Sequence, residues 1–215
     1  YIIKSGTIFI GARAFYNCTR LTNITIPKSV EEIGDNAFPM DTVLTVGYDS
    51  YAEQWAIENG FKGIKLHPDF QKFNIDGENA EKFYRAAGDK LPILFHVGDD
   101  RYDYSAPERL VKMAKKYPQN KFIAAHFGGY RCWKDVSVYK GLDNVYYDTC
   151  SSLPFISAQE ARSIIDMLGA DKFFFATDFP MWDSVGELER FNKIPLTDEE
   201  REMIFSKNLK RLLNI

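Results

Sequence analysis

The sequence predicts an α/β protein in which parallel strands form an open sheet or an arc of a barrel, preceded by a short repeat. Two observations carry this prediction. Short apolar runs alternate with helical patterns from residue 61 onward, starting near residues 61, 91, 121, 144 and 172. A six-residue pattern at residues 10–15 returns at residues 33–38. Alternating strands and helices are typical of parallel sheets with right-handed crossovers, and a fixed period of 20–29 residues is typical of leucine-rich solenoids.

The repeat occupies the N-terminal segment. Ile10-Gly-Ala-Arg-Ala-Phe15 and Ile33-Gly-Asp-Asn-Ala-Phe38 keep Ile, Gly, Ala and Phe in register at an offset of 23 residues. Between them, the spacing of Leu21, Ile24 and Ile26 fits a short strand whose apolar side chains join one stacked core inside the repeat. A second strand is expected at residues 43–46. Ser50 and Glu53 then have the spacing of a capping box, which predicts a terminal helix ending at Gly60.

The C-terminal segment contains five expected strands, at residues 61–67, 91–96, 121–126, 144–148 and 172–178. Each run is apolar early and ends in a polar residue, as in parallel strands with functional carboxyl ends. Three helix starts are predicted where Ser or Thr precedes Glu by three residues, at Ser105, Ser157 and Thr197.

Composition excludes several classes of function. With 45% hydrophobic residues, 27% charged residues and a net charge of −3, the chain has no basic field for nucleic acid. No apolar run approaches the roughly 20 residues that cross a bilayer. Cys18, Cys132 and Cys150 form no C-x-x-C pair, and buried free thiols are expected.

The polar strand ends predict a metal site. His67, His96 and His126 are the three histidines of the chain, and each ends an expected strand, as does Asp178. Side-chain alternation groups His96 with Leu94, His126 with Ala124 and Asp178 with Ala176 in an inward row. Imidazole and carboxylate are ligands of divalent metals, and zinc is the metal expected from these donors.

The N-terminal segment resembles the BspA-type leucine-rich repeats. Residues 10–27 follow the pattern Ile-Gly-x-x-Ala-Phe-x-x-Cys-x-x-Leu-x-x-Ile-x-Ile-Pro, and residues 48–60 are similar to a segment that often closes such arrays. The resemblance covers about residues 1–61. It implies a scaffold or an adhesive surface.

The C-terminal segment, about residues 62–215, resembles the amidohydrolase-related metal-dependent hydrolases, a branch of the amidohydrolase superfamily. The resemblance rests on four motifs: Gly63-Ile-Lys-Leu-His-Pro68, Phe95-His-Val-Gly98, Ala125-His-Phe-Gly-Gly129 and Thr177-Asp-Phe-Pro180. It implies a TIM-type barrel in which His96 and Asp178 bind the metal and His126 is catalytic, with Asp178 also accepting a proton. Hydrolysis or decarboxylation of a small aromatic acid is the implied chemistry, and a small molecule the implied substrate.

The chain departs from the family pattern at its start. The family's first strand carries a His-x-His pair, whereas residues 1–61 contain no histidine. Five strands over residues 62–215 fall short of the eight of a closed barrel. We therefore expect a partial barrel, with residues 1–61 and 62–215 as separate domains. His67 is the candidate third metal ligand, and Lys65 is either a cation at the rim or a carbamylated ligand.

The missing strands leave a second hypothesis open, namely a non-catalytic binding or adhesion module with a degenerate half-barrel. An open arc exposes strand edges, which favour aggregation unless they are covered. We expect residues 1–61 to pack against the first strand or its helices, with a second subunit or a protein partner as the other candidate cover. The hydrolase half suggests a cytoplasmic location, and the repeat half suggests the cell surface or secretion.

Overall fold

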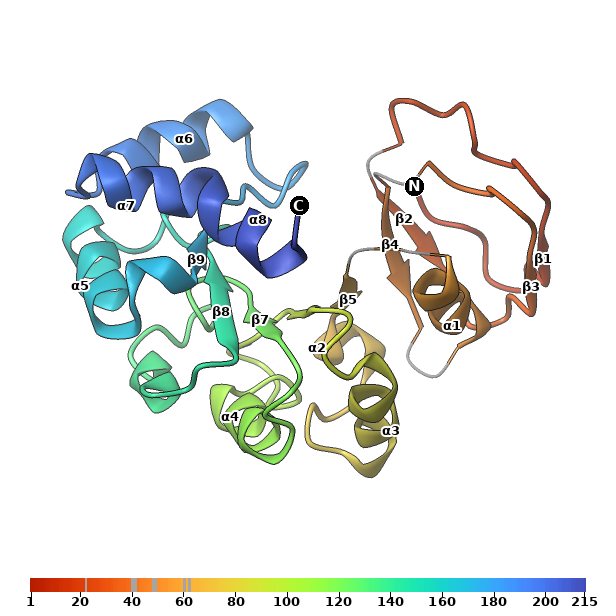
Figure 1. Ribbon diagram of the computed structural model, residues 1–215, viewed down its shortest axis with the longest axis horizontal. Helices are drawn as coiled ribbons and strands as arrows, with labels where there is room; N and C mark the ends of the chain where they lie inside the picture. The colour runs from red at the N-terminus through yellow and green to blue at the C-terminus, as the bar shows by residue number, and fades with distance from the viewer. Residues whose placement is uncertain (22, 40–41, 48–49, 60, 62) are drawn as a thin grey trace.

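The computed structural model describes residues 1–21, 23–39, 42–47, 50–59, 61 and 63–215. Over these residues a seven-stranded parallel sheet has the order β2-β4-β5-β6-β7-β8-β9 (Figure 1). Its strands are β2 (Asn23–Ile26), β4 (Val43–Val46), β5 (Ile64–Leu66), β6 (Ile93–Phe95), β7 (Phe122–Ala124), β8 (Val145–Asp148) and β9 (Phe173–Phe174). Five of them, β5 to β9, come from the C-terminal segment, as the sequence predicts.

The helices follow the strands in the expected alternation. They are α1 (Tyr51–Glu58), α2 (Pro68–Gln71), α3 (Glu78–Ala87), α4 (Pro107–Lys116), α5 (Ala158–Leu168), α6 (Ser184–Asn192), α7 (Asp198–Glu202) and α8 (Asn208–Leu213). Short 3-10 turns at Val136–Tyr139 and Ala170–Lys172 and a π-helical turn at Met203–Lys207 complete the set. None of the described helices is both long and apolar enough to cross a bilayer.

The repeat has the register that its 23-residue offset predicts. Ile10 of β1 (Phe9–Ile10) lies directly opposite Ile33 of β3 (Glu32–Ile33) in a parallel pair. The core of this segment is formed by apolar side chains that each repeat contributes at equivalent positions, together with residues of α1 and Phe61: Ile10, Ile24, Ile26, Ile33, Phe38, Leu44, Val46, Trp55 and Phe61. Helix α1 caps the stack, and the predicted end at Gly60 lies outside the described residues.

The repeat covers the edge of the barrel arc. Strand β4 of the repeat pairs with β5, with Thr45 opposite Lys65, so the two segments share one sheet (Figure 1). The expectation that the N-terminal segment packs against the first strand of the arc is confirmed. A paired edge offers no unpaired N–H or C=O row to another chain.

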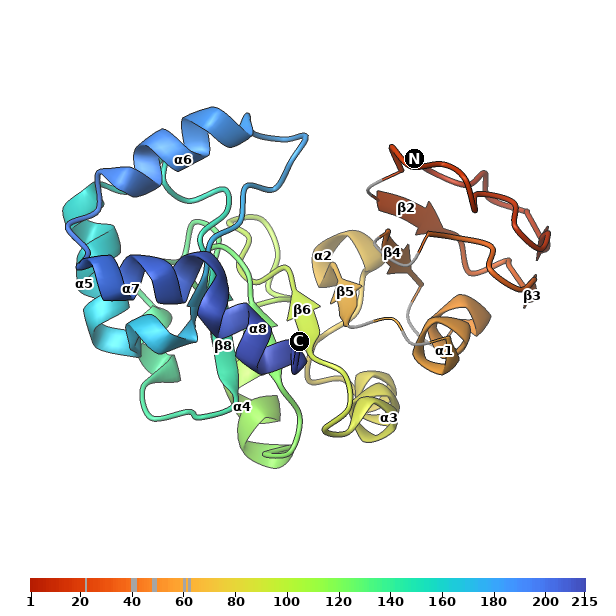
Figure 2. The same cartoon turned by 45° about the horizontal axis from the view of Figure 1, so that its top comes forward.

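The two faces of the sheet bury different sets of side chains. One face packs on α3, α4 and α5 through fully buried aromatic residues, among them Phe95, Phe122, Tyr147 and Phe173. On the opposite face, Leu212 of α8 packs against side chains from four strands: Leu94, Ile123, Tyr146 and Phe174. Figure 2 shows helix α8 in front of this part of the sheet. The C-terminal helix thus covers apolar surface that an incomplete barrel would otherwise leave open.

Of the three capping boxes predicted in the C-terminal segment, two are present. Ser157 and Thr197 each accept from the backbone of a glutamate three residues on, whose carboxylate binds back to the cap. Ser105 does not cap α4, which begins one residue later than predicted with Ala106 as its N-cap. The Ser105 hydroxyl is instead buried and donates to Asp69. The Ser105 hydroxyl thus binds a residue distant in sequence and does not cap the first turn of α4.

Replacing Ser157 with alanine is expected to destabilise the fold by about 1 kcal/mol, because it removes the side-chain acceptor for the first turn of α5. Urea unfolding followed by circular dichroism measures this loss. Ser163→Ala on the same helix is the matched control, since its exposed hydroxyl bonds only to Gln159 within the helix, and a change within about 0.5 kcal/mol is expected. Equal losses of unfolding free energy in both variants would contradict the role of Ser157 as the N-cap of α5.

Candidate metal centre

Three imidazoles meet at the carboxyl ends of neighbouring strands. The His67 and His96 rings stack with centroids 3.9 Å apart and planes 11° from parallel. The His96 and His126 rings meet at 4.7 Å, edge to face. The strand-end pattern predicts this gathering, since parallel strands bring their carboxyl ends to one edge.

The position of His67 depends on the repeat segment. The Gln71 side-chain amide donates to the Val46 carbonyl at 2.7 Å, and its oxygen accepts from the His67 backbone N–H at 2.8 Å. His67 also caps α2, its Nδ1 accepting from the Phe70 N–H at 3.4 Å. The last strand of the repeat therefore fixes one histidine of the candidate centre.

His126 reaches the centre by a turn, and the alternation argument for it was wrong. Ala124 faces the helix-covered core, so a continued strand would carry His126 there too. The backbone instead adopts left-handed conformations at His126 (φ 64°) and Phe127 (φ 55°). Asp148 holds this turn, because its Oδ1 accepts from the His126 N–H at 2.8 Å. Asp148 therefore positions the His126 backbone.

Hydrogen bonds fix the tautomers of two histidines. His126 Nδ1 lies 3.2 Å from the Cys150 carbonyl oxygen, which can only accept, and 3.2 Å from Cys150 Sγ, whose proton is donated to Asp148 Oδ1, so Nδ1 carries the proton. His126 Nε2 then accepts from His96 Nδ1 at 2.9 Å. His96 Nε2 is left with an unshared lone pair, and it is buried without a hydrogen-bond partner among the described residues.

All three imidazoles are held neutral. Burial, helped by the nearby Lys65 charge, lowers the pKa of His67 to about 4. Burial and the neighbouring imidazoles depress the pKa of His96 further. Burial also lowers the pKa of His126, with Asp148 acting in the opposite direction. Neutral imidazole is the form that binds metals.

This depression predicts that His67 in the metal-free protein titrates near pH 4 rather than near 6.5. Because its pKa is lower in the folded chain than in the unfolded one, the unfolded chain binds more protons between these values. Stability therefore falls as the pH drops from 6.5 to 4. Histidine NMR titration and urea unfolding at several pH values measure both effects, and His67→Gln should reduce the slope. A His67 midpoint near 6.5 would contradict the prediction.

Asp178 lies beside His126 rather than in a cluster with His96. Its Oδ2 accepts from the Ser151 hydroxyl at 2.6 Å, and that hydroxyl accepts from Trp182 Nε1 at 3.0 Å. Its charge acts on the pKa of His126. Two groups of described residues could hold a cation, namely His67, Asp69 and His96, and His126, Asp148 and Cys150. Asp178 is in neither, so its ligand role stays a prediction.

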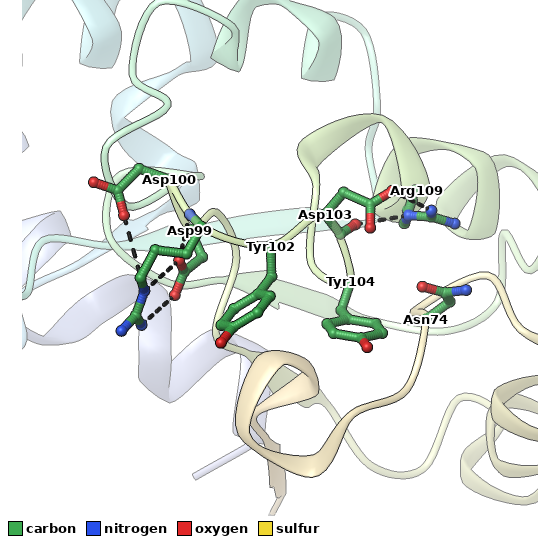
Figure 3. A pocket seen from close by; sticks show the side chains of 8 residues that line it. Asn74, Asp99, Asp100, Tyr102, Asp103, Tyr104 and Arg109 are labelled. Atoms are coloured by element: carbon green, nitrogen blue, oxygen red, sulfur yellow. Dashed lines mark hydrogen bonds and ion pairs between the residues drawn. The ribbon is translucent and has the colours of Figure 1, made fainter.

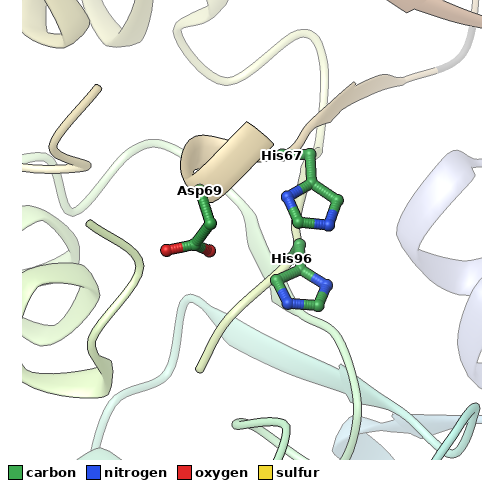
Figure 4. Close-up of side chains that lie close together, drawn as sticks. All are labelled: His67, Asp69 and His96. Atoms are coloured by element: carbon green, nitrogen blue, oxygen red, sulfur yellow. The ribbon is translucent and has the colours of Figure 1, made fainter. Parts of the chain in front are cut away.

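Sequence reasoning missed Asp69. This carboxylate is 4% exposed, and it directly follows the motif at residues 63–68 that carries the family resemblance. Its Oδ2 accepts from the Ser105 hydroxyl at 2.5 Å, and its Oδ1 has no hydrogen-bond partner among the described residues. Burial raises the pKa of Asp69, and the Ser105 hydrogen bond opposes that rise. Figure 4 shows the carboxylate beside the two stacked imidazoles.

Aromatic side chains surround the imidazoles. The Tyr130 ring lies 6.1 Å from that of His96 and 5.6 Å from that of His126. Trp133 Nε1 donates to the His126 carbonyl at 3.0 Å. Phe155 stacks on Trp133 at 6.1 Å, with the Arg131 guanidinium 4.0 Å from its centroid. These contacts form an apolar wall beside the centre with one cation on it.

A polar cavity of about 600 Å³ lies on the loop that follows β6 (Figure 3). Its acidic side chains are paired with arginines. Asp99 binds Arg101 at 2.7 Å, and Asp103 binds Arg109 at 2.7 Å. None of the three histidines is among the lining residues: Asn74, Asp99, Asp100, Arg101, Tyr102, Asp103, Tyr104 and Arg109. The cavity's carboxylates are thus committed to ion pairs rather than available to a metal.

The donors present fit a divalent metal. The centre offers neutral imidazoles and a buried carboxylate. Two of its buried atoms, His96 Nε2 and Asp69 Oδ1, have no hydrogen-bond partner among the residues that the structure describes. Buried polar atoms are normally satisfied, and imidazole with carboxylate is a donor set that zinc and related metals accept. The fold and this rim define a partial TIM-type barrel with potential metal ligands at the carboxyl ends of its strands.

The chain belongs to the amidohydrolase family, whose profile matches residues 46–215. Residues 1–46 match the BspA type leucine rich repeat region. Both assignments confirm the resemblances found in the sequence. No curated protein sequence matches the chain.

Solved structures share the fold. An uncharacterised TIM-barrel protein from Bordetella bronchiseptica is 19% identical with a TM-score of 0.67, over 75% of this chain and 60% of that protein. A dihydroxybenzoic acid decarboxylase from Polaromonas with bound manganese is 18% identical, with a TM-score of 0.58 over 76% and 64% of the two chains. A 5-carboxyvanillate decarboxylase from Sphingomonas paucimobilis is 12% identical, with a TM-score of 0.60 over 80% and 67%. The chain thus spans about 60% of the length of the first of these.

Proposed function

We propose that this chain binds a divalent cation at the rim of its partial barrel and uses it to hydrolyse or decarboxylate a small molecule. The observation that carries the proposal is the set of three neutral imidazoles at neighbouring strand ends, of which His96 presents a buried nitrogen with no hydrogen-bond partner in the described part of the chain. Zinc is the expected metal from the donor types. Manganese is the second candidate, since it is bound in the Polaromonas decarboxylase.

A bound cation of this kind would lower the pKa of a water molecule to about 7 and polarise a substrate oxygen. His96 and His67 would hold it, with Asp178 as the expected carboxylate ligand. His126 would contact the substrate, and its neutral state suits it to orient or polarise a reacting group. Asp178 would accept the proton, with Ser151 and Trp182 fixing its orientation.

The aromatic wall favours a planar, partly apolar substrate. Tyr130, Trp133 and Phe155 offer ring faces and edges near His126, and aromatic rings pack well in such arrangements. Arg131 could pair with a substrate carboxylate. Two of the similar structures are decarboxylases of aromatic acids, so small aromatic acids are the first substrates to test.

Metal analysis of the purified protein tests the proposal, followed by screens for ester and lactone hydrolysis and for release of carbon dioxide from aromatic acids. About one equivalent of metal and turnover in one screen are expected. A parent protein that takes up no zinc or manganese after dialysis against either metal would overturn it.

The absence of histidine from residues 1–61 favours one alternative function, a non-catalytic binding module. The repeat exposes several large apolar side chains to which a protein partner could bind: Tyr1, Ile2, Ile8, Phe9 and Tyr16. Such a module would suit the cell surface, whereas the enzyme would suit the cytoplasm. A metal-free parent with no turnover would favour this alternative.

A further inference from the structure

We infer that Asp69, together with His96 and His67, supplies the ligands of the divalent cation. This inference rests on the proposed function, because it names the carboxylate that completes the same site. One ligand atom from each of these residues lies within 4.8 Å of the others. Asp69 lies two residues after His67 in the sequence, but its side chain is oriented by Ser105, 36 residues away.

The carboxylate of Asp69 is buried with one oxygen unused. The residue is 4% exposed, and Oδ1 has no hydrogen-bond partner among the described residues. Burying a carboxylate oxygen without a donor or a cation is unfavourable. A cation beside Oδ1 would supply the missing partner.

Ser105 orients this carboxylate. Its hydroxyl is fully buried and donates to Oδ2 at 2.5 Å. Its carbonyl accepts from the Gly98 N–H at 3.0 Å, which ties the loop to the segment that follows His96. Hydrogen bonds from outside a metal site commonly fix its carboxylates in this way. With Oδ2 occupied, Oδ1 is the oxygen left for a metal.

His96 offers the matching nitrogen. His126 Nδ1 donates to the Cys150 carbonyl, so His126 Nε2 accepts from His96 Nδ1. The proton of His96 is therefore on Nδ1, and the lone pair of its Nε2 is free. That nitrogen is also buried without a hydrogen-bond partner among the described residues. Asp69 and His96, which follow the carboxyl ends of the neighbouring strands β5 and β6, thus each have one buried unpartnered atom and belong to one cluster.

The ligand atoms must draw closer to bind one ion. Donors around a tetrahedral zinc, with bonds of about 2.1 Å, lie roughly 3.4 Å apart. The rings of His67 and His96 are stacked in nearly parallel planes. Because an imidazole lone pair lies in the plane of its ring, the two lone pairs do not point at a common position, and one ring must turn to bind the same ion. His67 is the ring more easily turned, since it is held by the long bond from Phe70 and by stacking on that exposed ring.

The two neighbouring carboxylates, Asp148 and Asp178, bind other partners, and among the described residues neither shares a candidate cation cluster with His96. Asp148 Oδ1 accepts from the His126 N–H, the Cys150 N–H and the Cys150 thiol. Asp178 Oδ2 accepts from Ser151. If Asp69 is the ligand, Asp178 is free to act as the proton acceptor alone.

Zinc and manganese titrations by calorimetry on the full chain test this assignment. Asp69→Asn should weaken binding by about 100-fold or more, and Ser105→Ala by about 10-fold, the lower end of the loss from removing an orienting partner. Asp178→Asn, which removes the competing candidate carboxylate, should weaken binding less than Asp69→Asn does. Asp76→Asn is the matched control, because this partly buried aspartate pairs with Arg109 and Lys112 away from the centre. Circular dichroism establishes that each variant is folded.

A measurement on the parent does not depend on how the variants fold. In the 15N NMR spectrum, zinc should shift the signal of His96 Nε2 and perturb His67, with less effect on Nδ1 of His126. Unchanged binding in Asp69→Asn, or loss in Asp178→Asn alone, would overturn the Asp69 assignment and leave the proposed function standing. A parent that binds neither metal would overturn both.

Discussion

His96→Ala should abolish stoichiometric metal binding, with affinity falling at least about 100-fold, since loss of even an orienting partner costs 10–100-fold. The variant removes the buried Nε2 that has no partner among the described residues. Turnover of any substrate found in the screens should fall with the metal. Calorimetric titration and metal analysis after dialysis measure the effect.

His126→Gln is the matched control for this prediction. Its backbone N–H still donates to Asp148, and glutamine can still accept from His96. Metal affinity should stay within about 10-fold of the parent, while turnover falls by about 10²- to 10⁴-fold, the range of general acid–base catalysis. If His96→Ala keeps the parent's metal affinity, the centre does not lie at this rim.

Val46→Asp should destabilise the protein by about 3–5 kcal/mol, because it buries an unpaired charge. Val46 is 3% exposed in the repeat core, and its strand covers β5. Loss of that cover would expose a strand edge, so aggregation on gentle heating is also expected. Urea unfolding and light scattering measure the two effects.

Val43→Asp provides the comparison on the same strand, since Val43 is 51% exposed. Its effect should lie within about 0.5 kcal/mol. Metal affinity should fall in Val46→Asp but not in Val43→Asp, because the Val46 carbonyl holds Gln71 and, through it, His67. Equal stability and solubility of the two variants would show that the repeat is not a structural cover for the arc.

The strands and the repeat could be predicted because their signals are local. The 23-residue offset places Ile10 opposite Ile33, and side-chain burial follows directly from that register. The five apolar runs became β5 to β9, somewhat shorter than expected. The cysteines illustrate the limit of composition, since Cys150 is buried but Cys18 is exposed.

The errors arose where a distant group competes with a local one. Ser105 has the sequence pattern of a helix cap, yet its hydroxyl bonds to Asp69, 36 residues away. His126 departs from strand alternation because Asp148 stabilises a left-handed turn. Neither partner is near in sequence, so neither could be inferred from spacing.

The sequence by itself determined the order of strands and helices, the repeat register and the placing of each histidine at a strand end, because periodicity and polar termini are properties of short segments. Only the tertiary structure decided that β4 joins β5, that His96 keeps a free buried nitrogen and that Asp69 lies beside it. Those features depend on which side chains meet across the fold, where burial and competition for hydrogen bonds select one partner among several.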